Sequence, residues 1–331
     1  MIRKAFSRIA QFVSTPLKAW RDSKGYPLSR RLDIAWNALR LEWAYLRKKT
    51  LFARRVHGRI MNLNVRRAGV GYELAIWGDR EELDTQVAKQ GVLPGMNVVD
   101  VGANVGYYTM LMANQVGESG RINSFEPFPD NYEDLVRNVK LNKLEGKIET
   151  AQMAVSSSEG EAMFFVGEGD NLGSLYNLRE ARNPNPKQIA VKTTTMDQIA
   201  QRIGPVDFLR MDIEGAECLV FDGMQQVFKQ AIPPRILFEV HPSGDVDPDP
   251  RFTPYFEKLL AVGYLPRYMI SSANPHAMQR FKDLGYTALR SSRDGQSLFA
   301  DICPEHLVQL GARRPKVVRS IFLVHGNDTR G

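Results

Sequence analysis

Short apolar runs alternate with segments of helical periodicity along most of the chain, which predicts an α/β fold with a largely parallel sheet. The runs expected to form its strands lie at residues 97–101, 121–125, 148–155, 206–211 and 235–240. Helical spacing of apolar residues follows at 107–116, 131–142, 195–201, 216–229 and 251–263. Two later runs, 264–270 and 297–302, are expected to end the sheet as an antiparallel pair.

An N-terminal extension precedes this pattern. In residues 1–20, apolar side chains recur at helical spacing opposite Arg3, Lys4 and Arg8, which predicts a basic amphipathic helix. Such a helix suits an anionic membrane surface, and it equally suits docking on its own domain or on a second subunit of a homo-oligomer. A second helix is expected at 30–50, with basic residues at its end.

The segments that flank the α/β pattern complete the expected organisation. Residues 60–66 and 72–77 are predicted as strands and 84–90 as a helix, with arginines nearby that either bind a phosphate or carboxylate or lie on a solvated face. The stretch 167–187, rich in Gly, Asn and Pro, is expected to be a substrate lid or a poorly ordered loop. We therefore divide the chain into a helical extension (1–50), an α/β domain (51–310) and a basic tail (311–331) that trails over the outside.

Composition and charge limit the possible partners and location of the protein more than they limit the reaction at its site. A formal net charge of +7 suits nucleic acid, an anionic glycan or an acidic membrane face, but it also suits an ordinary soluble enzyme. The two cysteines are far apart and lack a C-x-x-C pattern, so we expect no zinc site and no disulfide framework. A reducing, cytoplasmic location is expected, peripheral to the inner face of the membrane at most, because no run is long enough to span a bilayer and no secretion signal is apparent.

A turn of small residues follows the strand at 97–101, in the sequence NVVDVGANVG. Strand, glycine turn and helix open many nucleotide-binding α/β folds, in which glycine lets the backbone approach a ligand. The spacing G-A-N-V-G does not match the dinucleotide fingerprint G-x-G-x-x-G. Asp100, two residues before Gly102, is expected to place a carboxylate beside the turn, where it would repel a pyrophosphate.

A second acidic residue favours a nucleoside ligand that carries no phosphate. Glu126 follows the next strand, 20 residues after Gly106, where a carboxylate can accept hydrogen bonds from both ribose hydroxyls. S-adenosylmethionine (SAM) carries an ammonium and a sulfonium but no phosphate. The two acids therefore favour SAM over NAD as the cofactor.

Several segments resemble the FkbM family of SAM-dependent methyltransferases. They are DVGANVGYYTMLMA, GRINSFEPFPDNYEDLVRNVKLN, the AVS at 154–156, VDFLRMDIEGAE and ILFEVHP, and MDIEGAE is the most specific of them. The resemblance covers residues 73–303. It implies the class I methyltransferase fold, which is a Rossmann-like, doubly wound, mostly parallel seven-stranded sheet with an antiparallel last strand. It also implies methyl transfer to oxygen or, less often, to nitrogen, and it does not name the acceptor.

The ends of the strands predict where the cofactor lies. In an open doubly wound sheet, ligands bind beyond the carboxyl ends of the strands, so the acidic residues found there should share one rim with His241. Residues after the third strand are candidates for the apolar wall beside the adenine. The predicted cofactor-binding residues are Asp100, Gly102, Ala103, Asn104, Gly106, Glu126, Pro127, Met153, Ala154 and Asp212.

Methyl transfer from SAM is a direct displacement, so the protein mainly aligns the nucleophile, the methyl carbon and the sulfur. A hydroxyl acceptor benefits from a general base. His241 is the first candidate because imidazole titrates near neutrality, although a structural hydrogen bond to Glu239 or Asp212 explains it equally well. Asp212 is expected to act as a second base or to orient His241, and Glu214 to hold the acceptor. No metal is expected; a divalent ion would use Asp212, Glu239 and His241.

The acceptor class remains open within limits. We expect a hydroxyl of a small molecule, glycan or secondary metabolite, with N-methylation of a peptide side chain or of nucleic acid as the alternative. Nucleic acid is disfavoured because the sequence lacks both the (D/N)-P-P-(Y/F/W) element of amine methylation and the Pro-Cys nucleophile of C5 methylation. An inactive SAM-binding scaffold is the alternative that is not an enzyme.

Overall fold

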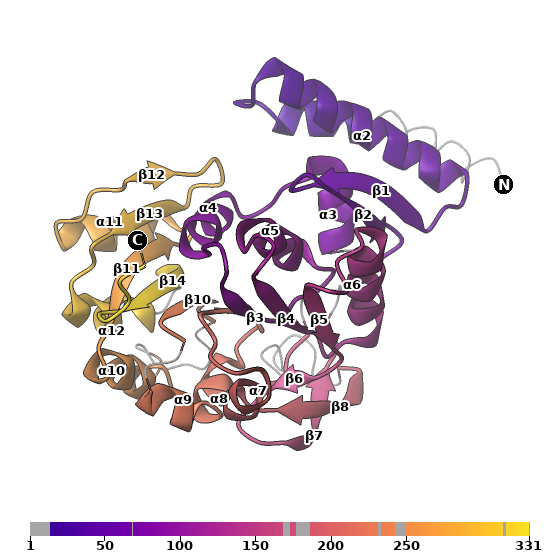
Figure 1. Ribbon diagram of the computed structural model, residues 1–331. Coiled ribbons are helices and arrows are strands. Elements are labelled where there is room, and N and C mark those ends of the chain that lie inside the picture. The colour runs from indigo at the N-terminus through magenta and orange to yellow at the C-terminus, as the bar shows by residue number, and fades with distance from the viewer. Residues whose placement is uncertain are drawn as a thin grey trace.

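A nine-stranded mixed sheet forms the centre of the computed structural model, with strand order β12-β13-β11-β14-β10-β9-β3-β4-β5 (Figure 1). A two-stranded hairpin and a separate three-stranded sheet accompany it. The structure describes residues 14–67, 69–167, 173–176, 186–230, 233–241, 249, 251–313 and 316–330.

Five parallel strands, from β10 to β5, make one end of the large sheet, as the alternating pattern predicted. All of them except the edge strand β5 are almost wholly buried, because helices cover both faces of the sheet. In chain order they are β3 (Asn97–Val101), β4 (Arg121–Phe125), β5 (Ile148–Ala151), β9 (Phe208–Met211) and β10 (Arg235–Glu239).

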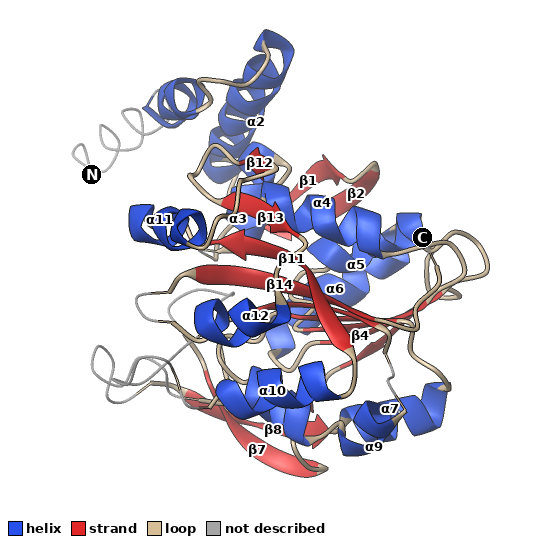
Figure 2. Cartoon of the chain, turned by 90° about the vertical axis from the view of Figure 1, so that its left-hand side faces the viewer, coloured by secondary structure: helices blue, strands red, loops and turns tan. Residues whose placement is uncertain are grey.

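Two apolar cores lie on opposite faces of this sheet (Figure 2). The helices of the first face are α4 (Glu82–Gly91), α5 (Tyr107–Gln115) and α6 (Pro129–Leu141). Those of the second face are α7 (Met196–Ile203), α8 (Glu217–Asp222), α9 (Gln225–Lys229), α10 (Thr253–Ala261), α11 (Pro275–Asp283) and α12 (Pro304–Gly311). The single helix predicted at 216–229 is therefore two helices, because the chain leaves the helical path at Gly223 and Met224.

The C-terminal segment corrects the sequence-based organisation. Residues 311–331 are not an external tail, because they contain β14 (Val318–His325), which lies inside the sheet and pairs antiparallel with both β10 and β11 (Tyr264–Ser271). The predicted antiparallel pair at 264–270 and 297–302 does form, between β11 and β13 (Ser297–Ala300), and β12 (Arg290–Ser291) extends it to the sheet edge.

The seven strands from β11 to β5 thus contain one antiparallel strand, β14, beside six that run parallel to one another. This is the class I methyltransferase arrangement that the resemblance implied, enlarged at one edge by β13 and β12.

A small sheet stands beside the parallel edge of the large one. The predicted strand at 148–155 breaks after β5, and its last residues form β6 (Ala154–Val155), which pairs with β8 (Gln188–Thr194). The third strand, β7 (Gly160–Phe165), pairs antiparallel with β8. Most of the stretch predicted as a lid, 167–187, lies outside the described residues.

Before α4 the described chain forms α2 (Leu28–Leu46), which lies in the predicted extension, and then the hairpin β1 (Leu51–Val56) and β2 (Arg59–Asn64) and the helix α3 (Val70–Trp77). The prediction of a strand at 72–77 was wrong: this apolar segment is a helix, and Gly71 lets it pass so close to β2 that a Cβ would stand 2.7 Å from the carbonyl oxygen of Asn64. Residues 14–22 are helical, and the rest of the amphipathic helix predicted at 1–20 lies outside the described residues. Among the described residues, none of the helices combines the length and the hydropathy needed to cross a bilayer.

Candidate active site

A pocket opens at the carboxyl ends of β3, β4, β9 and β10, the sheet edge at which the sequence predicted ligand binding. The predicted site residues in its lining are Gly102, Ala103, Asn104, Glu126, Pro127, Met153, Ala154, Asp212, Glu214 and Glu239. Asp100, Gly106 and His241 are not among the lining residues. Charged or aromatic lining residues that the sequence did not indicate are Arg80, Glu81, Tyr107, Tyr108, Phe128, Phe164, Arg210 and Arg319.

The glycine turn after β3 is held against its neighbours by its backbone. The amides of Gly102 and Ala103 both donate to the carbonyl of Phe125 on β4, at 3.0 Å each. Gly102 has φ +79°, and a Cβ there would stand 2.1 Å from the carbonyl oxygen of Asp212. Only glycine fits this close crossing of two strand ends. Gly106 has a different structural role. It precedes the first residue of α5 with φ +95° and packs against Leu135.

Glu126 is held in place at the end of β4, where the sequence predicts a carboxylate that binds the ribose. Its carboxylate is 5% exposed and accepts one hydrogen bond from the amide of Asn104, at 2.8 Å, and another from the amide of Phe128, at 2.9 Å. Asn104 itself adopts φ +51°, which turns its amide toward the carboxylate. An ionised carboxyl group has about four lone-pair sites, so it can accept backbone and hydroxyl donors together.

An apolar wall closes the side of the pocket next to Glu126. Ala154 and Phe164 are buried there in one small cluster with Val191. The partly buried side chains that pack on this cluster are Phe128, Val166, Leu175 and Ile189. Of these residues, Ala154, Phe164, Phe128, Val166 and Leu175 face the pocket, and Met153 joins them. The wall is therefore larger than the residues after the third strand, because the small sheet adds its own face.

Asp100 lies beneath the pocket, contrary to the prediction that it contacts the ligand. Its side chain is fully buried, accepts a 2.6 Å hydrogen bond from the hydroxyl of Thr109 and lies 3.5 Å from a guanidinium nitrogen of Arg210. Burial raises the pKa of Asp100, and Arg210 opposes that rise. Arg210 also donates to the carbonyl of Gly102 at 3.1 Å and to Asp212 at 2.8 Å, so Asp100 supports the turn through this arginine.

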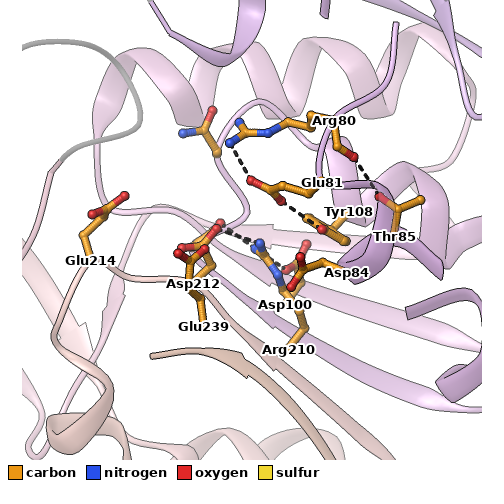
Figure 3. Close-up of polar contacts among 12 residues, drawn as sticks. Arg80, Glu81, Asp84, Thr85, Asp100, Tyr108, Arg210, Asp212, Glu214 and Glu239 are labelled. Atoms are coloured by element: carbon orange, nitrogen blue, oxygen red, sulfur yellow. Dashed lines mark hydrogen bonds and ion pairs between the residues drawn. The ribbon is translucent and has the colours of Figure 1, made fainter. Parts of the chain in front are cut away.

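Glu214 is the carboxyl group best suited to exchange a proton in this pocket. It follows β9 with φ +50° and lies near Asp212 (Figure 3). Its side chain is 26% exposed. Burial raises its pKa to about 7; His241 lowers it, while Asp212 and Glu239 raise it further. A group with this pKa is deprotonated in about half of the molecules at neutral pH, which suits a general base.

His241 does not suit the role of base that the sequence predicted. Its Nδ1 lies 2.7 Å from Glu217, and its Nε2 lies 3.3 Å from Glu239 and 3.7 Å from Glu214. Burial disfavours the imidazolium, but Glu217 and Glu239 outweigh it and hold the pKa of His241 well above its usual value. An imidazole that is already protonated cannot accept the proton of an acceptor. Glu217, fully buried, is thus a partner that the sequence did not single out.

The wall near α4 consists of paired charges that the sequence did not predict (Figure 3). Arg319, on β14, bridges Glu81 at 3.0 Å and Glu239 at 2.9 Å. Glu81 also accepts from Arg80 at 2.6 Å and from the Tyr108 hydroxyl at 2.9 Å. Among the described residues, Nε of Arg80 is buried without a hydrogen-bond partner. Arg80 thus lines the pocket with one ion pair, to Glu81, whereas Arg210 and Arg319 each pair with two or more carboxylates.

The side chains present do not suit a resident metal. Two triads, Asp212–Glu214–His241 and Glu81–Asp212–Glu239, bring ligand atoms within 4.8 Å of one another. Their carboxylates already have cationic partners, because Arg210 binds Asp212, and Arg319 binds Glu81 and Glu239. A metal ion would have to displace these ion pairs, and the imidazolium of His241 would repel it.

The chain is similar in sequence to known methyltransferases. The family model of the methyltransferase FkbM domain matches residues 100–287. Methyltransferase sdnD of Sordaria araneosa is 26% identical over an alignment of 177 positions that covers 44% of this chain and 67% of that protein. Protein-L-isoaspartate O-methyltransferase 1 of Arabidopsis thaliana is 28% identical over 92 residues, only 28% of this chain and 40% of that protein.

Among solved structures, methyltransferase FkbM of Methylobacillus flagellatus KT aligns with a TM-score of 0.34 and 11% identity, over 69% of this chain and 52% of that chain. That structural likeness is weak, and the relationship rests on the sequence match.

Proposed function

Because the chain belongs to the FkbM family of SAM-dependent methyltransferases, we propose that it transfers the methyl group of SAM to a hydroxyl of a glycan or secondary-metabolite acceptor. The observation that carries the proposal is the position of Glu214, a carboxyl group that lines the pocket beside Asp212 and His241 and whose pKa those surroundings raise to about 7. A neutral hydroxyl is a poor nucleophile, and a base that is half ionised at neutral pH can remove its proton as it attacks.

The nucleoside of SAM occupies the part of the pocket at the ends of β3 and β4. Its ribose hydroxyls donate to Glu126, which the amides of Asn104 and Phe128 hold in place. The adenine lies against the apolar wall that includes Ala154 and Phe164. The turn at Gly102 leaves room for the ligand because no Cβ projects from it.

The methionine end of SAM points toward the charged wall. Its ammonium and the sulfonium are cations, which the carboxylates of Asp212 and Glu239 favour. Its carboxylate needs a cationic donor, and Arg80 is a lining arginine that can supply one. Arg210 and Arg319 are occupied by their own carboxylates.

In the transfer itself, the acceptor oxygen attacks the methyl carbon while the bond from that carbon to sulfur breaks. S-adenosylhomocysteine leaves as a neutral thioether, and the hydroxyl proton passes to Glu214. His241 takes no proton in this scheme; as an imidazolium it neutralises Glu217 and Glu239 and thereby keeps the rim compact.

The test combines acceptor discovery with one substitution. Extracts of cells that lack the gene should contain an acceptor one CH₂ lighter than in normal cells, and the purified chain should methylate it. Glu214→Gln should then lower kcat by about 10²–10⁴-fold with SAM affinity unchanged. The exposed Glu118→Gln is the matched control. Undiminished turnover of Glu214→Gln contradicts the proposed base.

The same experiment separates the alternatives. Methylation that appears on a nitrogen of a peptide or of nucleic acid would replace the hydroxyl proposal while keeping the cofactor site. If SAM binds but no methyl transfer to any extract component occurs, the inactive scaffold is the better description.

A further inference from the structure

One side of α2 carries a continuous apolar stripe that is exposed in the described part of the chain. Its members are Leu28, Leu32, Trp36, Trp43 and Leu46, and each of these side chains is at least 49% exposed. At 3.6 residues per turn they fall within about a quarter of the helix circumference. The opposite side, with Ile34, Ala38 and Leu41 fully buried, packs into the domain. Helix α2 therefore has two apolar sides, of which folding uses only one.

The segment that carries the stripe is rich in exposed cations, and one of them, Arg47, stacks on Trp43 of the stripe. Residues 14–50 contain nine Lys and Arg against three acidic residues. Of those acids, Glu42 is buried, Asp33 is paired with Arg30 and Arg54, and Asp22 is paired with Arg21. The cations classed as exposed are Lys18, Arg21, Lys24, Arg40, Arg47, Lys48 and Lys49. The surface around α2 is thus strongly positive.

Helix α2 lies at the periphery of the molecule (Figures 1 and 2). Arg30, on the inner side of the helix, pairs with Asp79 at 2.8 Å just beyond α3. Asp33, one turn further, binds Arg54 of the hairpin at 2.6 Å. These contacts fix the rotation of α2 about its own axis, so the apolar stripe is held facing outward.

We propose that this side of α2 docks the enzyme on an anionic lipid bilayer. Leucine and tryptophan enter the boundary between headgroups and acyl chains, and flanking lysines and arginines attract anionic headgroups. A second copy of the chain fits poorly, because a symmetric contact would bring the same cations together. Nucleic acid fits poorly as well, because it offers no apolar partner for three leucines. The proposal concerns residues 28–46 and is independent of the acceptor.

Flotation with lipid vesicles tests the proposal on the full chain. Vesicles of phosphatidylcholine with phosphatidylglycerol should bind the protein, and vesicles of pure phosphatidylcholine should bind it far less. Raising salt from about 0.1 M to about 1 M should weaken binding because it screens the headgroup charge. Tryptophan emission should shift to the blue on binding, as Trp36 and Trp43 leave water.

The triple variant Leu32→Gln, Trp36→Gln, Trp43→Gln should bind these vesicles at least about tenfold more weakly and lose the blue shift. The control, Leu265→Gln with Leu289→Gln, changes exposed apolar side chains elsewhere and should bind normally. Melting temperature and SAM affinity should be unchanged in both. Normal vesicle binding by the triple variant overturns the proposal. A dimer in solution that the triple variant dissociates also overturns it, in favour of a second copy, as does equal binding to neutral vesicles.

Discussion

Replacing Glu126 by glutamine tests the nucleoside site with the smallest change of shape. One carboxylate oxygen faces the amide of Asn104 at 2.8 Å and the other faces the amide of Phe128 at 2.9 Å. The glutamine NH₂ must therefore meet a backbone N–H on one side, and on that side it cannot accept from a ribose hydroxyl. Losing one hydrogen bond to a charged acceptor costs about 1.5–3 kcal/mol, which corresponds to a dissociation constant roughly 10- to 150-fold higher.

Isothermal titration with SAM and with S-adenosylhomocysteine measures this loss directly. The affinity of Glu126→Gln for both ligands should fall by a similar factor, because both ligands contain the ribose. Glu133→Gln, an exposed substitution on the neighbouring α6, should bind both normally. The assignment of Glu126 to the ribose is refuted if the variant remains folded and binds both ligands within twofold of the unmodified chain.

Three further substitutions probe other parts of the pocket. Arg80→Gln should weaken the binding of S-adenosylhomocysteine but not that of 5′-methylthioadenosine, which lacks the amino-acid carboxylate. If titration shows that the affinity for both ligands falls equally, Arg80 does not contact the carboxylate. Gly102→Ala should lower the melting temperature and abolish SAM binding because its Cβ would meet a carbonyl at 2.1 Å, whereas Gly146→Ala, with open space around it, should do neither. His241→Asn should cost about 3–5 kcal/mol of stability in urea unfolding at pH 6. Because the pKa of His241 is raised in the folded state, this stabilisation is complete below the pKa of histidine in the unfolded chain and is lost as pH rises through the folded pKa. The difference in unfolding free energy between the unmodified chain and the variant should therefore become smaller at alkaline pH. A difference that does not change with pH contradicts the imidazolium.

The parallel half of the fold could be predicted because its signals are local. The strands at Asn97–Val101 and Arg121–Phe125 have the predicted bounds, since each is a short segment with apolar residues that stands between a turn and a helical segment. Strand β14 was missed although Val317, Val318 and residues 321–324 are apolar. Its arginine and serine, Arg319 and Ser320, interrupt the run, and its place between β10 and β11 depends on pairing across the sheet, which local pattern does not report.

The candidate site was likewise predictable where it depends on local sequence and not where it depends on contacts between distant segments. Residues in the lining that follow strand ends, such as Glu126 and Glu214, were predicted because the fold brings strand ends together. Protonation was not predictable: His241 differs from an ordinary histidine only because Glu217 and Glu239 enclose it. One signal was available for the missed arginines, because Arg210 and Arg319 each stand inside an otherwise apolar strand, where a charge must have a partner.

A crystal structure of the chain with S-adenosylhomocysteine tests the central claim most directly. We expect both ribose hydroxyls within hydrogen-bond distance of Glu126, the adenine against Ala154 and Phe164, and the sulfur facing the side of the pocket that carries Asp212 and Glu214. A ligand whose ribose lies away from Glu126, or whose sulfur faces away from Glu214, would contradict the account.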